Sequence, residues 1–286
     1  MNILSTGGGT GLGHTLASFN YAVKMSEFFI ERGVDISLYF KWRNHDSFLS
    51  LYDVNLKFFK SEDPEMFINN SDSYRHDPKS EIEWVNLQSH NNIILDARST
   101  LSPDYEFLFK TISLKPHISK QLLDIIKNEL DCGDYTVIHV RGGDQIRNKY
   151  NSNFEKFLET NCKRIDDIIL KSNNKILLCT DNQDLVKKYV DNKTIFSKSL
   201  VYELYKENVY VDSSVSLHAQ LLGDKPHLMY RSNLSAIIDL YLLIFCKTLY
   251  ADSPNSGYAQ LAARLNRIFL KNNVSADTLF DTQKLV

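Results

Sequence analysis

The sequence predicts an α/β fold in which parallel strands alternate with helices, and three observations lead to this prediction. Short runs rich in Ile, Leu and Val are bounded by Asn, Asp or Gly, as strands buried in a parallel sheet are. Longer helical patterns separate these runs, and such alternation predicts sheets covered by helices on both faces. Of the 286 residues, 43% are hydrophobic and 24% are charged, which is typical of a globular core rather than of a disordered chain.

The predicted elements follow in chain order. The strands are expected at 36–41, 92–96, 135–141, 175–181 and 208–212. The helices are expected at 15–32, 118–130, 154–171, 183–190, 234–249 and 257–270. The polar segment 60–89, which contains two prolines, predicts a long loop or an irregular insertion. Because Pro116 precedes a new helical pattern, we expect two domains, 1–116 and 117–286.

Composition excludes several classes of protein. The formal net charge of −2 argues against a nucleic-acid binder that relies on bulk electrostatics. The short apolar start has no basic region of the kind that begins a signal peptide. Asp239 and Lys247 interrupt the most apolar stretch, so we expect a buried helix there and no membrane span, with peripheral membrane association left open. Four scattered cysteines without a zinc-like spacing predict reduced thiols in a cytoplasmic protein and no metal site.

A glycine-rich turn, GGTGLGHT, follows the short apolar start and precedes the first predicted helix. It resembles a P-loop in which His14 replaces the lysine, and His14 is a poor substitute because it is shorter and mostly neutral at pH 7. A P-loop-like NTPase is therefore an alternative function rather than the favoured one. The turn is also compatible with anion binding at a helix start, or with a tight strand-to-helix connection that holds no ligand.

The stretch VIHVRGGD, at 137–144, carries the strongest functional signal. The strand pattern stops at Gly142, which places Arg141 and Asp144 at a carboxyl end, where open α/β sheets bind ligands. An arginine there can clamp a phosphate through two charge-assisted hydrogen bonds, and the glycines let the phosphate approach the main chain. The alternative is an ordinary surface pair between Arg141 and Asp144, which would contribute little to stability.

These residues resemble a family signature. His139 to Asp144 is similar to the H-x-R-x-G/T-D motif of the fucosyltransferase-like glycosyltransferases, which include the bacterial nodulation α1,6-fucosyltransferases, the α1,2-fucosyltransferases and the protein O-fucosyltransferases. Residues 11–14 resemble the G-L-G-N opening of the α1,2 branch, with His14 in place of Asn. Residues 177–182 resemble a strand that ends in an S/T-D pair, and 237–265 resemble the last block of the family.

The resemblance implies a GT-B architecture, in which two Rossmann-like domains with parallel sheets face a central cleft. The first domain would bind the acceptor and the second the nucleotide sugar. The implied activity is inverting, metal-independent transfer of a sugar, most simply fucose from GDP-fucose, to a glycan of a bacterial surface polysaccharide. The absence of a D-x-D triplet agrees, because metal-dependent glycosyltransferases use such a pair to hold a divalent ion. Another nucleotide-sugar donor and a catalytically silent nucleotide-binding protein are the alternatives.

The family match also implies roles for individual residues. Arg141 would clamp the donor diphosphate, while His139 and Asp181 would meet the guanine or the ribose. A carboxylate can accept from both N1–H and the exocyclic amine of guanine, although Asp181 could instead cap the helix that follows. The rest of the predicted donor site is Gly142, Asn182, Ser253, Ser256 and Gly257, where the two serines have helix capping as their alternative role.

The sequence offers further candidates outside this donor site. For the catalytic base we consider Asp144, His14 and Asp46. Asp239, inside an apolar helix, is expected to brace Arg141 or the Ser256 turn. Trp42, within the polar segment 41–46, offers a platform for an acceptor sugar, or else belongs to a solvated loop. Two further polar residues, His227 and Arg231, are interpreted as loop residues rather than as parts of a site.

Overall fold

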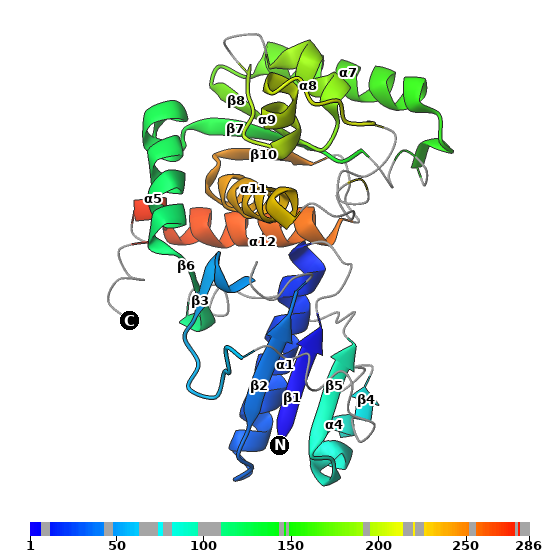
Figure 1. Cartoon of the computed structure of the whole chain (residues 1–286). Helices are drawn as coiled ribbons and strands as arrows, with labels where there is room; N and C mark the ends of the chain where they lie inside the picture. Colours follow the sequence, from blue (N-terminus) through cyan, green and yellow to red (C-terminus); the bar gives the residue numbers. More distant parts are fainter. Residues whose placement is uncertain are drawn as a thin grey trace. The chain divides into compact units, whose positions relative to one another are not determined.

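The structure is a computed structural model of the chain. It divides into two compact units, Met1–Ile118 and Ser119–Phe280, and each has its own parallel sheet (Figure 1). The described residues are 1–6, 12–42, 48–62, 74–76, 82–96, 110–142, 146, 149–190, 195–213, 220, 226–251, 256–277 and 280.

Four parallel strands form the main sheet of the first unit, in the order β2-β1-β5-β4. Their bounds are Asn2–Thr6 for β1, Ser37–Lys41 for β2, Tyr74–His76 for β4 and Asn92–Asp96 for β5. The unit also contains an antiparallel pair, β3 (Tyr52–Val54) with β6 (Ile112–Leu114), and the short helices α4 (Ile82–Asn86) and η1 (Leu87–Ser89). All four strands of the main sheet end at the same edge because they are parallel.

Helix α1 (Leu12–Ile30) packs against this sheet through an aromatic core. The fully buried ring of Phe19 lies 4.6 Å from the ring of Phe40 on β2 and 5.5 Å from that of Phe48. Trp42 belongs to the same core: it is 0% exposed, and its ring lies 6.3 Å from that of Phe48. The interpretation of Trp42 as a sugar platform is therefore wrong, because the core buries the indole. Residues 43–46 of that segment, including Asp46, lie outside the described residues.

The second unit is built on a parallel sheet in the order β10-β7-β8-β9. The strands are β7 (Tyr135–Val140), β8 (Lys175–Thr180), β9 (Ile195–Phe196) and β10 (Thr248–Ala251). The helices are α5 (Pro116–Asp124), which continues as a π-helical turn at Ile125–Glu129, then η4 (Asp131–Gly133), α7 (Phe154–Lys171), α8 (Gln183–Tyr189), α9 (Leu200–Lys206), α11 (Pro226–Phe245) and α12 (Gly257–Asn272). Every residue of β7 is buried, as a central strand of a parallel sheet requires.

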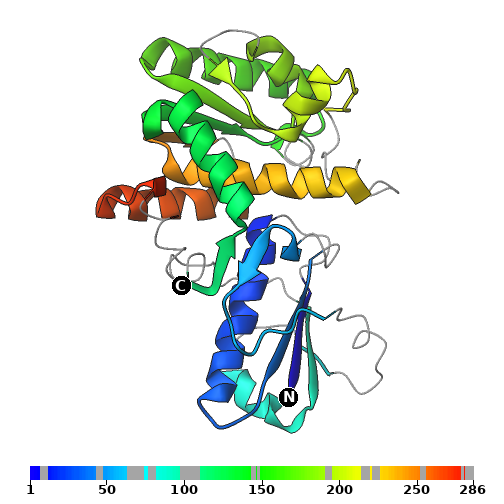
Figure 2. The same cartoon turned by 60° about the vertical axis from the view of Figure 1, so that its left-hand side comes forward.

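Helices cover both faces of this second sheet, as predicted. Ile138 and Val140 of β7 face α7, α8 and α9 in one apolar cluster. Alternate residues face the other way, and the Tyr135 hydroxyl donates to the carbonyl of Leu242 on α11 at 2.8 Å. Figures 1 and 2 show α11 and α12 side by side within the second unit. The α/β class with parallel sheets is therefore confirmed.

Some predicted elements differ from the observed ones. The strand predicted at 208–212 is wrong, because the side chain of Gln183 takes its backbone hydrogen bonds: the amide nitrogen donates to the carbonyl of Val209 at 2.8 Å, and the N–H of Val211 donates to the amide oxygen at 3.2 Å. The loop predicted at 60–89 contains strand β4 as well as α4 and η1. The helix predicted at 234–249 begins earlier, at Pro226, and gives way to β10 at Thr248.

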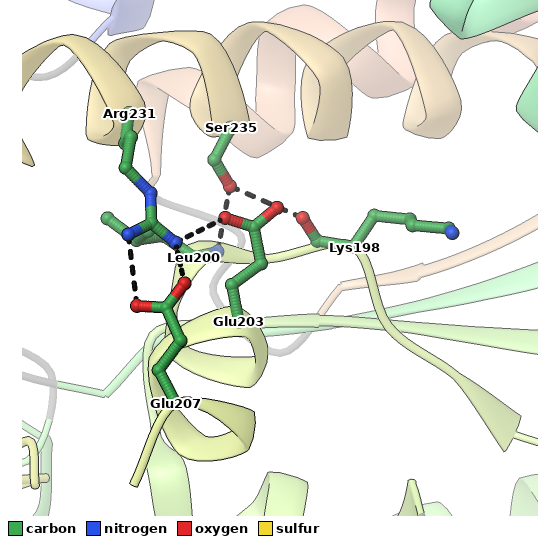
Figure 3. Close-up of polar contacts among 6 residues, drawn as sticks. All are labelled: Lys198, Leu200, Glu203, Glu207, Arg231 and Ser235. Atoms are coloured by element: carbon green, nitrogen blue, oxygen red, sulfur yellow. Dashed lines mark hydrogen bonds and ion pairs between the residues drawn. The ribbon is translucent and has the colours of Figure 1, made fainter. Parts of the chain in front are cut away.

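The longer α11 changes the interpretation of its first turns, since His227 and Arg231 are helical rather than loop residues. Arg231 reaches α9, where its guanidinium forms a two-bond contact with Glu207 at 2.8 and 3.1 Å and a third bond to Glu203 at 3.0 Å (Figure 3). These bonds lower the pKa of Glu207 and raise that of Arg231. Because the pairs are exposed, they orient α9 more than they stabilise it.

Among the described helices, α11 alone is long and apolar enough to cross a membrane by length and composition. In this structure 56% of its apolar window is buried inside the protein. Tyr241, Leu242 and Leu243 are all 0% exposed. The burial agrees with the prediction of a core helix.

A second contact between α11 and α9 predicts an unusual capping effect. Ser199 occupies the N-cap position of α9, yet its side chain caps nothing, and the hydroxyl of Ser235 on α11 accepts from the N–H of Leu200 at 2.8 Å instead. We expect Ser235→Ala to lower the free energy of unfolding by about 1 kcal/mol, because it leaves that buried N–H without a partner. Urea unfolding measures this loss, and the control is Ser89→Ala, which removes an exposed hydroxyl of η1 and should leave the free energy of unfolding unchanged. An unchanged free energy of unfolding in Ser235→Ala would contradict this assignment of the cap.

Candidate functional site

The candidate site lies at the carboxyl edge of the second sheet. Strands β7 and β8 pair in register from Tyr135 opposite Lys175 to Val140 opposite Thr180, so both end at the same level. Arg141 and Gly142 follow β7, while Asp181 and Asn182 follow β8. The fold thus brings together four of the predicted site residues at two adjacent strand ends, in the position where open α/β sheets bind ligands.

The side chain of Asp181 links the carboxyl ends of β7 and β8. The N–H of Gly142 donates to the Asp181 carboxylate at 2.5 Å. A Cβ atom at position 142 would lie only 3.1 Å from this carboxylate oxygen, so any other residue there would have to displace the carboxylate by a few tenths of an ångström. The alternative role of Asp181 as the cap of α8 is wrong, because the next residue, Asn182, occupies the N-cap position.

Asn182 is fully buried beneath this link, and its amide has two different environments. The oxygen accepts from the N–H of Leu185 at 2.9 Å and caps α8. The amide nitrogen has no hydrogen-bond partner among the described residues, and it lies 3.7 Å from where a Cβ of Gly142 would be. A buried donor without a partner costs free energy, which marks this nitrogen as a group that a ligand or an ordered water can satisfy.

His139, two residues before Arg141, is a buried and neutral imidazole. It is 8% exposed, its ring lies 5.6 Å from the ring of Tyr258 on α12, and its Nδ1 has no partner among the described residues. Burial, with a smaller contribution from the charge of Arg141, lowers the pKa of His139 to about 4. At neutral pH it therefore offers a hydrogen bond without a charge, and Arg141, which is half-buried, supplies the positive charge.

The start of α12 is the third part of this edge. Strand β10 pairs with β7 in the same direction, and Ser256 and Gly257 follow it after 252–255, which lie outside the described residues. The buried hydroxyl of Ser256 accepts from the N–H of Ala259 at 3.4 Å, so its capping role is present. The positive end of the α12 dipole lies at the first residue, Gly257, and favours an anion there.

The remaining predicted residues are placed as follows. Asp144 and Ser253 lie outside the described residues, as does the side chain of His14, which is on α1 in the first unit. No three His, Cys, Asp or Glu side chains come together as a metal site within the part of the chain that the structure describes.

Asp239 of α11 forms no hydrogen bond or ion pair with Arg141 or Ser256 in the described structure, and its hydrogen-bond partner is the thiol of Cys179 on β8. Burial raises the pKa of Asp239 to about 7, and the hydrogen bond from the thiol lowers it only partly. Cys179 lies directly opposite His139 in the β7–β8 register, so both side chains project from the same face of the sheet. The prediction that Asp239 braces Arg141 or the Ser256 turn is therefore wrong. Asp239 instead binds β8, the strand that pairs with the strand of His139.

Sequence analysis missed the contributions of Tyr258 and Cys179 to the surroundings of His139. Tyr258 contacts the imidazole and is itself held by α11, since its hydroxyl donates to the carbonyl of Ala236 at 2.8 Å. The equal lengths of the predicted strands 135–141 and 175–181 were the available signal for Cys179, because pairing them end to end places it opposite His139.

The fold is a mixed α/β fold with parallel sheets, and it resembles solved fucosyltransferase structures. A structure of NodZ α-1,6-fucosyltransferase co-crystallised with GDP matches with a TM-score of 0.57 and 17% identity, covering 92% of this chain and 92% of that chain. One soaked with GDP-fucose matches with a TM-score of 0.56 and 16% identity, again covering 92% of each. Fucosyltransferase NodZ from Bradyrhizobium, as the selenomethionine protein, matches with a TM-score of 0.60 and 17% identity, covering 92% and 91%.

No family model matches the sequence, and no curated protein matches it. At 16–17% identity, the likeness to the NodZ structures is one of fold. The expected fucosyltransferase-like fold is therefore confirmed.

The two buried titratable groups of this region predict opposite effects of pH on stability. The raised pKa of Asp239 means that its folded form keeps a proton that the unfolded chain loses near pH 3.8, so its contribution to stability falls as pH rises from about 4 to 7. The lowered pKa of His139 means that the unfolded chain binds a proton that the folded form excludes between pH 6.5 and 4. Its contribution to stability therefore rises with pH over that range.

We expect Asp239→Asn to remove the first effect. Relative to the parent protein, this variant should gain roughly 1–3 kcal/mol in its free energy of unfolding between about pH 4.5 and pH 7, as measured by urea unfolding at both values. Asp167→Asn, at an exposed position of α7, is the matched control and should show no gain. An unchanged pH dependence in Asp239→Asn would show that the carboxyl group is not held protonated by the fold.

Proposed function

We propose that the chain is a glycosyltransferase of GT-B type that transfers a sugar from a GDP-sugar donor, most simply fucose from GDP-fucose, to a hydroxyl of a glycan. The observation that carries the proposal is the convergence of Arg141, the Asp181–Gly142 link and the start of α12 at one sheet edge. Further support comes from the fold of NodZ, an α-1,6-fucosyltransferase with structures that contain GDP and GDP-fucose.

In this proposal the protein stabilises the departing diphosphate with its own charges. Arg141 contributes a full positive charge, and the first turn of α12 contributes about half a charge through its dipole. Fixed donors of this kind, aimed at the leaving group, are usually the largest catalytic contribution in such reactions. The transfer would therefore need no divalent metal ion and no other cofactor, and it would invert the configuration at the sugar.

The nucleobase would meet the Asp181 carboxylate and the neutral polar groups of the same edge. Asp181 would accept hydrogen bonds from guanine, and the imidazole of His139 would contact the base or the ribose. The amide nitrogen of Asn182, which has no partner among the described residues, and the backbone of Gly142, which carries no side chain, are the remaining groups of this proposed site. Because His139 is neutral at pH 7, it can recognise a base without competing with Arg141 for the diphosphate.

The other parts of the reaction are assigned by the same proposal. Residues 117–286 would bind the donor, with Ser253 helping to hold the diphosphate, and residues 1–116 would bind the glycan acceptor. The catalytic base would come from Asp144, His14 or Asp46. The setting would be the cytoplasmic stage of bacterial surface polysaccharide synthesis.

Nucleotide selectivity tests the proposal against its alternatives. GDP should raise the thermal unfolding temperature of the protein, while UDP and CDP should leave it unchanged, because only guanine offers the paired donors that suit Asp181. Release of GDP from GDP-fucose should then persist in the presence of a chelator. Equal protection by UDP would favour another donor, and magnesium-dependent ATP hydrolysis would favour the NTPase alternative.

Arg141→Ala should lower the turnover of GDP-fucose by about a hundredfold or more, because removal of one preorganised donor at a developing charge typically has an effect of this size. The matched control is Arg267→Ala, which removes an exposed arginine on α12 of the same unit and should leave the rate unchanged. Near-normal transfer by a folded Arg141→Ala protein would exclude this arginine from the leaving-group site.

A further inference from the structure

Tyr210 is the most exposed aromatic residue in the part of the chain that the structure describes, with 78% of its surface accessible to solvent. It belongs to the segment 208–213, which follows α9 in the second unit. Val211 and Ser213 of the same segment are buried. The segment thus carries a large exposed ring on an anchored main chain, and the groups of the proposed donor site do not include this ring.

The side chain of Gln183 holds the main chain on both sides of Tyr210. Its amide nitrogen donates to the carbonyl of Val209 at 2.8 Å, and its amide oxygen accepts from the N–H of Val211 at 3.2 Å. The backbone N–H of Gln183 donates in turn to the hydroxyl of Ser213 at 3.1 Å. Gln183 is 2% exposed, so water does not compete for these bonds. A ring on a main chain that is already fixed loses little conformational entropy when it contacts a ligand.

The same bonds place the segment beside the candidate site. Gln183 begins α8 and lies two residues after Asp181, and two residues span at most about 7 Å of main chain. The segment 208–213 therefore meets the carboxyl edge of the second sheet next to the Asp181 carboxylate.

The alternation of side chains gives the direction of the Tyr210 ring. One amide bonds to the carbonyl before Tyr210 and to the N–H after it, as a neighbouring strand does in a parallel ladder, so the main chain is extended there. Val211 packs into the apolar cluster that contains Ile138 and Val140. Because successive side chains of an extended segment point to opposite sides, Tyr210 lies on the other side, which is the side of His139.

The charges around the segment favour a neutral ligand group over a phosphate. Asp212 lies within the segment, and Asp181 and Asp184 lie in the turn that starts α8. These carboxylates would repel an anion. The positive groups of the edge, Arg141 and the start of α12, follow β7 and β10 on the other side of the sheet order. A nucleotide bound across the edge would therefore place its phosphates toward α12 and its base toward the segment.

We propose that the ring of Tyr210 stacks on the nucleobase of the bound nucleotide and is a specificity-determining residue of the donor site. The inference rests on the proposed function and adds a contact that this function does not include. Asp181 can bind the polar edge of guanine, but a carboxylate offers nothing to the faces of the ring, and Tyr210 supplies that surface. The alternative is an ordinary exposed tyrosine, which predicts no effect on nucleotide affinity.

Calorimetric titration of the intact protein with GDP and with inorganic pyrophosphate tests this inference. Tyr210→Ala should weaken GDP at least about fivefold, because an aromatic side chain stacked on a base typically contributes this much or more. Pyrophosphate, which has no base, should bind as it does to the parent protein. Tyr210→Phe keeps the ring and should retain the parent affinity for GDP. The matched control is Val209→Ala, which shortens a 43% exposed side chain of the same segment and should change neither affinity.

The outcomes separate this inference from the proposed function. Parent-like GDP affinity in Tyr210→Ala overturns the stacking contact and leaves the donor site as proposed. An equal loss for GDP and pyrophosphate, or an equal loss in Val209→Ala, would show that the variants disturb the segment, and overturns it too. A loss in Tyr210→Phe as large as in Tyr210→Ala would make the hydroxyl the contact and exclude stacking. Failure of the parent protein to bind GDP would contradict both the proposed function and this contact.

Discussion

The hydrogen bond from the Gly142 N–H to the Asp181 carboxylate is the contact on which the proposed site depends. It joins the ends of β7 and β8 at the level where the register already brings them side by side. The same contact holds the main chain directly after Arg141, where it leaves β7. A side chain at position 142 would crowd this carboxylate, so the glycine favours the close approach of the two strand ends.

Around this contact, the groups that carry positive charge are different from the neutral polar groups. Burial keeps the imidazole of His139 neutral, with Tyr258 on one side and Arg141 two residues along the chain. The positive character of the edge then comes from the half-buried guanidinium and from the start of α12, both suited to an anion. Nearby, Asp239 lies buried beside the thiol of Cys179, and burial raises the pKa of Asp239 to about 7, so this carboxyl group is only partly ionised at neutral pH. Such an arrangement suits a ligand that has an anionic part and a neutral, polar part.

Local sequence patterns predicted the helices and strands whose ends are set by neighbouring residues. Helix 154–171 and strand 92–96 were predicted at their observed bounds, and the Asn153 side chain that accepts from the Lys156 N–H explains the clear start of that helix. The prediction failed at 208–212, where a glutamine 26 residues earlier takes the backbone bonds, and at Trp42, which the aromatic core buries. For the candidate site, the parallel direction of the strands alone predicts that the residues after β7 and β8 lie at the same edge of the sheet. The partner of Asp239 could not be predicted, because it depends on which face of β8 meets α11.

A crystal structure of the protein with GDP tests the central claim most directly. The account predicts the diphosphate within hydrogen-bond reach of the Arg141 guanidinium, with the guanine toward Asp181 and His139 and no metal ion between the phosphates and the protein. GDP bound away from the carboxyl edge of β7 and β8, or an Arg141 side chain turned away from the phosphates, would contradict it.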